Sequence, residues 1–232
     1  MEKMARVRTL LVDLGKIQRL GDEGALVLQL MMACNDLAAA NQALGRCRED
    51  TSERTRSVRR GTSLYFVRLQ LAHLKEALDI IHEIHDCPNL REIVDDCPRP
   101  IPEYFVKLLT FAKGGTCERE FVKYVALVRH KITFHYDHRI IQAALNHRSR
   151  RRGHIAHFMT IADDARLFRF EIADDLVDTL ITHTLWKVAP SAQTSVDADQ
   201  IAELCFGIFT TLMDFAGTFA TRYMEKNALF TR

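Results

Sequence analysis

The stretch from Thr62 to Asp86, TSLYFVRLQLAHLKEALDIIHEIHD, decides the fold class of this chain. Its large apolar residues recur at intervals of three or four, which is the period of an α-helix with one buried face. They are Leu64, Val67, Leu71, Leu74, Leu78 and Ile81. The stretch therefore predicts a long helix whose apolar face lies in a core.

Helical patterns also occupy most of the chain on either side of this stretch. The five prolines and ten glycines fall between the periodic segments, as is typical of a helical protein. One further helix is expected to begin after Thr116, a candidate N-cap residue. The others are expected over residues 2–20, 23–46, 89–96, 102–113, 174–188 and 197–227.

Residues 154–172 have a different pattern. Phe168, Phe170 and Ile172 alternate with neighbours that are mostly charged, which favours a β-strand with one apolar side. We therefore predict one all-α domain over residues 1–232, an antiparallel helical bundle with a small β-hairpin insertion around residues 154–172.

Composition indicates a soluble globular protein, since 47% of residues are hydrophobic and 27% are charged. Apolar runs such as ALVLQLMMAC (Ala25–Cys34) are much shorter than the ~20 residues that cross a bilayer. The first residues have no uninterrupted apolar stretch, so no secretory signal is predicted. We expect a cytoplasmic protein without membrane contact.

Neither a metal nor a cofactor is expected. The six cysteines are scattered and form no CxxC pair, so they are predicted to be reduced thiols rather than zinc ligands. The sequence has no glycine-rich phosphate loop and no GxSxG turn.

The net charge is only +2, but the arginines are clustered. One cluster lies within SERTRSVRRG, and the second lies within NHRSRRRGH. Such clusters mark nucleic-acid-binding surfaces or solvated surface runs. The second, near a helix C-terminus, also fits a helix dipole that prefers positive charge. The clusters comprise Arg54, Arg56, Arg59 and Arg60, and Arg148, Arg150, Arg151 and Arg152.

The segment FVKYVALVRHKITFHYDHR (Phe121–Arg139) combines an apolar stripe with titratable residues. At about 100° per residue, His135 is the next member of the stripe, and Arg129 lies about 120° from it. Burial at this position favours a neutral imidazole, which can accept a proton from a hydroxyl group. A guanidinium offers a planar fork to a phosphate, so His135 and Arg129 together could cleave RNA without metal. The stripe consists of Phe121, Val125, Val128 and Ile132.

The heptapeptide RHKITFH (Arg129–His135) resembles the signature of the HEPN superfamily, an Arg followed by a polar residue and then, after four to six residues in all, a His. The resemblance covers about residues 61–147 and implies an antiparallel helical bundle. It implies a metal-independent endoribonuclease of a toxin or antiviral-defence system, with Arg129 and His135 catalytic and His130 auxiliary. It also implies a homodimer and a cognate regulatory protein. The second arginine cluster follows the motif by less than four helical turns, so near the site it could hold an RNA backbone through phosphate contacts. Some members carry a Tyr two residues after the His, where this chain has Asp137, so regulation through that Tyr is not expected.

Two alternatives remain open. In the first, the chain is a non-catalytic HEPN-like helical module that binds a protein partner or a nucleotide. There His135 is structural, and Arg129 pairs with a carboxylate such as Asp137 or Glu120. In the second, His135, Asp137 and His138 bind a metal, which requires the helix to end at Phe134. A regular helix separates His135 from Asp137 by about 160°.

Overall fold

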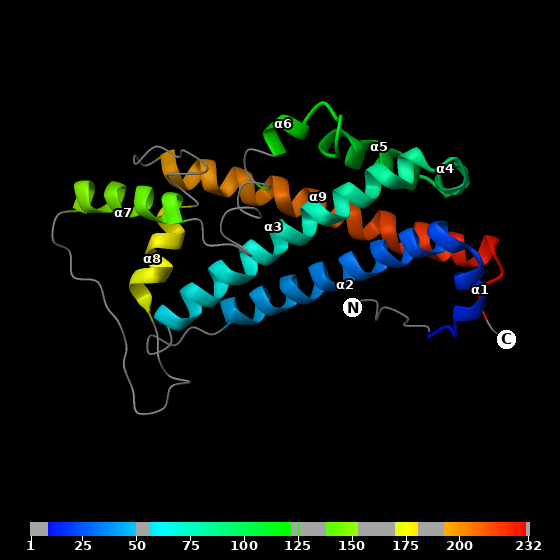
Figure 1. Ribbon diagram of the computed structural model, residues 1–232, viewed down its shortest axis with the longest axis horizontal. Coiled ribbons are helices and arrows are strands. Elements are labelled where there is room, and N and C mark those ends of the chain that lie inside the picture. Colours follow the sequence, from blue (N-terminus) through cyan, green and yellow to red (C-terminus); the bar gives the residue numbers. More distant parts are fainter. Residues whose placement is uncertain are drawn as a thin grey trace, which may run out of the picture.

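The computed structural model describes residues 9–49, 56–121, 125, 138–152, 170–180 and 193–230. These ranges are mostly helical, and their only β-structure is an isolated antiparallel bridge between Val12 and Phe230. The all-α class is therefore confirmed. The helices are α1 (Leu14–Arg19), α2 (Gly21–Glu49), α3 (Arg56–Asp86), α4 (Pro88–Asp95), α5 (Ile101–Phe111), α6 (Glu118–Phe121), α7 (His138–Arg152), α8 (Glu171–Thr179) and α9 (Gln193–Lys226) (Figure 1).

The long helices α2, α3 and α9 form the body of the molecule (Figure 1). Helix α2 packs along α3, and α9 contacts α2, α4 and α5. Four of the six apolar positions predicted for α3 are buried, namely Leu71, Leu74, Leu78 and Ile81. The three-four spacing therefore identified the core face of α3 correctly.

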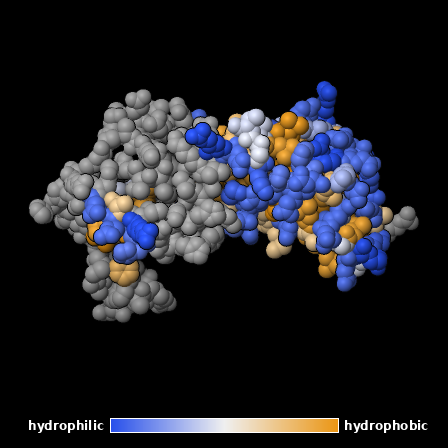
Figure 2. Space-filling view, turned by 45° about the horizontal axis from the view of Figure 1, so that its top comes forward, coloured by the Kyte–Doolittle hydropathy of each residue, from blue (hydrophilic) through white to orange (hydrophobic). Residues whose placement is uncertain are grey.

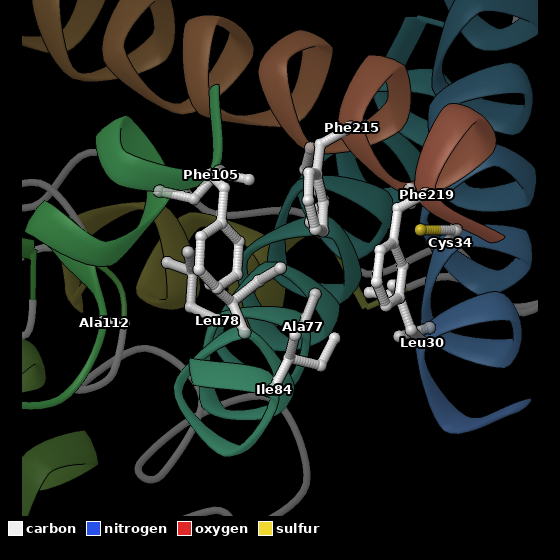
Figure 3. Packing of buried hydrophobic residues seen from close by; sticks show 14 of the residues in the cluster. Leu30, Cys34, Ala77, Leu78, Ile84, Phe105, Ala112, Phe215 and Phe219 are labelled. Carbon is white, nitrogen blue, oxygen red and sulfur yellow. The ribbon is translucent and has the colours of Figure 1, made fainter. Parts of the chain in front are cut away.

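Aromatic rings join α5 to α9 inside this core (Figure 3). The ring centroids of Phe105 and Phe215 lie 5.2 Å apart, and those of Phe215 and Phe219 are stacked at the same separation. Leu78 of α3 and Leu30 of α2 belong to the same buried cluster. Since each of these side chains is at most 2% exposed, the core joins four helices.

The turn between α5 and α6 depends on two glycines. Gly114 has a φ of +79°, which side chains rarely allow. A Cβ on Gly115 would lie 2.2 Å from the carbonyl oxygen of Leu109. Helix α6 begins at Glu118, so Cys117 rather than Thr116 precedes it. The Glu118 carboxylate accepts a hydrogen bond from the Gly114 N–H at 2.8 Å.

The helix expected over residues 2–20 is wrong in its N-terminal part. Residues 9–13 are not helical, and residues 1–8 lie outside the described ranges. The Asp13 side chain caps α1 by accepting from the Lys16 N–H at 3.1 Å, and the Asp13 N–H donates to the Leu229 carbonyl at 2.9 Å. Pairing with the distant C-terminal segment therefore replaces the helix that local spacing favours.

The hairpin expected around residues 154–172 is not confirmed. Residues 153–169 lie outside the described ranges, and Glu171 and Ile172 belong to α8 instead of a strand. Ile172, Leu176 and Leu180 are four residues apart, which is a helical spacing. Acidic residues near a helix N-terminus also favour this structure.

Helix α9 contains a segment, Glu203–Lys226, that is long and apolar enough to cross a membrane by length and composition. It is the one such segment in the described part of the chain, and 33% of it is buried. Its large apolar side chains Leu212, Phe215 and Phe219 are each 0% exposed. Packing within the bundle therefore accounts for these three side chains.

Candidate functional site

The segment that leads to the Arg129–His135 motif starts in the core. Phe121 is 1% exposed and Val125 is 0% exposed, as predicted for the first two members of the stripe. The ring of Phe121 packs edge-on against Phe111 of α5, with centroids 6.3 Å apart. Arg129, His130 and His135 lie outside the described residues, so their convergence on one phosphate stays a prediction.

The predicted RNA-binding residues Arg148, Arg150, Arg151 and Arg152 lie in the last turns of α7. This helix contains five arginines and no aspartate or glutamate. Its Ala144 is 0% exposed, whereas Leu145 is 49% exposed. At 1.5 Å per residue, the arginines lie roughly 6–12 Å along the helix beyond the Ala144 anchor. The helix is therefore held near its middle and carries its positive charge at its end.

Helix α8 packs against both α7 and α3. It contacts both helices, and Thr179 and the following Leu180 are buried at its C-terminal end. Its four carboxylates belong to Glu171, Asp174, Asp175 and Asp178. This packing places the first turns of α3, with Arg56, Arg59 and Arg60, at the same end of the molecule as α7 (Figure 1). Sequence spacing gave no signal for this proximity, because the two clusters are separated by almost 90 residues.

The thiols of Cys34 and Cys205 offer little reactivity. All six cysteines are free. Burial raises the pKa of Cys34 to about 11 and that of Cys205 to about 12, so both remain protonated at neutral pH. Within the described ranges, no group of three or more His, Cys, Asp or Glu residues could hold a metal ion.

The arrangement can attract a polyanion at the end formed by α7, α8 and the start of α3. Arginine suits phosphate recognition because its planar guanidinium donates two parallel hydrogen bonds. The phosphate backbone supplies most of the binding free energy in many nucleic-acid complexes. Comparison of the chain with protein-family models, with curated proteins and with solved structures found no match.

Proposed function

We propose that this protein is a metal-independent endoribonuclease of HEPN type. Arg129 and His135 cleave RNA, with His130 in an auxiliary role, and Arg148, Arg150, Arg151 and Arg152 hold the RNA backbone. The observation that carries the proposal is the position of α7: it begins three residues after His135 and carries five arginines without a carboxylate. The motif is therefore followed directly by an element suited to hold the polyanion that the motif would cut.

The proposed reaction is an intramolecular transesterification. Neutral His135 accepts the proton of a ribose 2′-OH, and the 2′ oxygen attacks the adjacent phosphorus. The bond from phosphorus to the 5′ oxygen breaks, and this oxygen takes a proton from water as it leaves. Arg129 stabilises the negative charge that builds on the phosphate. The products are a 2′,3′-cyclic phosphate and a 5′-hydroxyl end.

The further parts of the proposal follow from the HEPN resemblance. The protein acts as a homodimer in the cytoplasm, in which two motifs meet across the interface, and a cognate regulatory protein controls it. A toxin or antiviral-defence system is the setting in which such an enzyme acts. The HEPN-like core spans about residues 61–147.

Incubation of the purified protein with total RNA in EDTA tests this function. We expect cleavage with 2′,3′-cyclic phosphate ends, and a loss of about 10²-fold or more for His135→Ala, the range for removal of a general base. Circular dichroism checks that the variant is folded. Equal cleavage by the folded variant and the wild type would exclude His135 as the base.

Exposed apolar side chains support the second candidate, a non-catalytic module that binds a protein partner. Met32 of α2, Val106 of α5 and Phe206 of α9 are 64%, 63% and 60% exposed. Hydrophobic patches interrupt the mostly hydrophilic described surface (Figure 2). Such patches can mark protein-binding surfaces. This candidate gains support if the wild type cleaves no RNA and His135→Ala unfolds the protein.

A further inference from the structure

We propose that two copies of this chain associate through the outer face of α2, with the two α2 helices antiparallel about a two-fold axis near residue 41. In this arrangement Asp36 of each copy lies opposite Arg46 of the partner subunit. The homodimer of the proposed function joins the two motif segments, whereas this pairing uses a helix that is described along its outer face. The inference therefore stands independently of the proposed function.

One whole face of α2 is open to solvent. The helix lies along an outer edge of the bundle (Figure 1) and packs against α1, α3 and α9. Leu30, Leu37 and Leu44 form its inner face and are at most 6% exposed. The outer face follows intervals of four and three residues from 25 to 46, and all of its residues but the half-buried Ala43 are exposed. They are Ala25, Gln29, Met32, Asp36, Ala39, Ala43 and Arg46.

The composition of this outer face suits another helix better than water. The solvent side of a surface helix is normally rich in charged residues, but only two of these seven are charged. Met32 is 64% exposed, and three of the seven residues are alanines. Alternation of four and three residues is the spacing of the seam between two paired helices. Small side chains in such a seam allow the two helix axes to approach closely.

The two charges on the outer face select the partner and its direction. Asp36 and Arg46 are about 15 Å apart along α2, too far to pair with each other. The Asp36 side chain is 60% exposed, and its nearest described cation is His73, at 3.9 Å. Arg46 is exposed and has no ion pair within the described part of the chain. An antiparallel second copy forms two Asp36–Arg46 ion pairs, whereas a parallel copy brings like charges together.

The same register places small residues at the centre of the contact. Ala39 of one copy lies opposite Ala43 of the partner subunit, on either side of the two-fold axis. Polar residues within a helical seam fix its register, which is the role of Asp36 and Arg46 here. The overlap is about five helical turns, which is smaller than the contact of about 800 Å² per partner in a stable complex. The dimer is therefore expected to form in a concentration-dependent way.

Charge reversal tests the register in the full-length protein. The two variants are Asp36→Arg and Arg46→Asp, measured separately and as an equimolar mixture. Sedimentation velocity at low salt, from about 1 µM to about 500 µM, gives the dimer dissociation constant of each sample. Lys107→Asp, at an exposed position of α5, is the control for a change of net charge. Circular dichroism checks that each variant is folded.

Each single variant should dimerise about 10-fold or more weakly than the wild type, because two attractive pairs become two repulsive ones. In the mixture, a dimer of one chain of each kind again has two opposite-charge pairs. Its dissociation constant should return to within about 3-fold of the wild type. High salt should reduce the difference between the wild type and the single variants. The control should associate as the wild type does.

Three results would overturn the proposal: a wild type that remains monomeric, single variants that associate normally, or a mixture that fails to recover. If Asp36→Arg unfolds, Ala39→Glu takes its place, since it puts a bulky charge at the centre of the seam and should also prevent this dimer. Loss of association in the variants without any RNA cleavage by the wild type contradicts the proposed function alone. RNA cleavage together with normal association of both variants contradicts the α2 pairing alone.

Discussion

At the scale of single residues, Gly115 is the described glycine at which an added Cβ would lie closest to other atoms. An alanine there would place its Cβ 2.2 Å and 2.4 Å from the carbonyl oxygens of Leu109 and Thr110. These are backbone atoms, so the turn must move to relieve the clash. We expect Gly115→Ala to lower the free energy of unfolding by about 2–4 kcal/mol in urea denaturation.

Gly217 is the matched control, since a Cβ there meets nothing within 4 Å in the interior of α9. Gly217→Ala should raise the free energy of unfolding by about 0.5–1 kcal/mol through helix propensity. Equal stability of the two variants would show that the turn adapts freely. The expected difference matters for the proposed function because this turn starts the segment that leads to the Arg129–His135 motif.

The buried thiol of Cys34 should make the free energy of unfolding depend on pH in the alkaline range. Burial raises the pKa of this thiol from 9.0 to about 11. The folded state therefore holds the thiol proton more tightly than the unfolded state does. This difference contributes to the free energy of unfolding, and the contribution is complete below pH 9. It is lost as the pH rises from about 9 to about 11, by up to about 3 kcal/mol. Urea denaturation from pH 9 to pH 11 should show that the free energy of unfolding falls less steeply with pH in Cys34→Val than in the wild type. The same dependence on pH in both proteins would contradict the prediction.

At the scale of elements, the sequence predicted those helices whose burial follows from their own spacing. Helices α3, α4 and α5 begin and end within a few residues of the expectation, except for the longer start of α3. The predictions failed where a distant segment decides the conformation. Val12 pairs with Phe230, and α8 packs between α3 and α7, neither of which is visible in local periodicity.

The docking of α7 can be tested with two neighbouring positions. Ala144 is 0% exposed and Leu145 is 49% exposed, so a carboxylate is buried at the first position and solvated at the second. Ala144→Glu should detach α7 or lower the free energy of unfolding by about 2–4 kcal/mol. Leu145→Glu should change it by no more than about 0.5 kcal/mol.

Hydrogen exchange of the α7 amides measures the difference directly. Protection should be lost across the helix in Ala144→Glu and retained in Leu145→Glu. If the proposed function holds, Ala144→Glu should also weaken binding to RNA, because the α7 arginines lose their fixed position next to the motif. Equal protection in both variants would show that α7 does not depend on Ala144 for its docking.

At the scale of the whole molecule, the sequence could predict the start of the buried stripe that leads to the Arg129–His135 motif but not the helices that surround it. The stripe that begins with Phe121 and Val125 was correct for both members that the structure describes. Residue spacing fixes which face of a helix is buried, but it does not fix which helix covers that face. For this reason the proximity of the two arginine clusters follows only from the fold.

The proposed homodimer leads to a prediction about mixed subunits. If two motifs act together across a two-fold interface, Arg129 of one subunit and His135 of its partner serve the same phosphate. A mixture of Arg129→Ala and His135→Ala chains then contains dimers in which one of the two sites has both residues intact. With random exchange, such a mixture should recover about a quarter of the wild-type cleavage, although each variant alone is inactive. Light scattering confirms that dimers are present, and dimers without recovered cleavage would show that each chain uses its own Arg129 and His135.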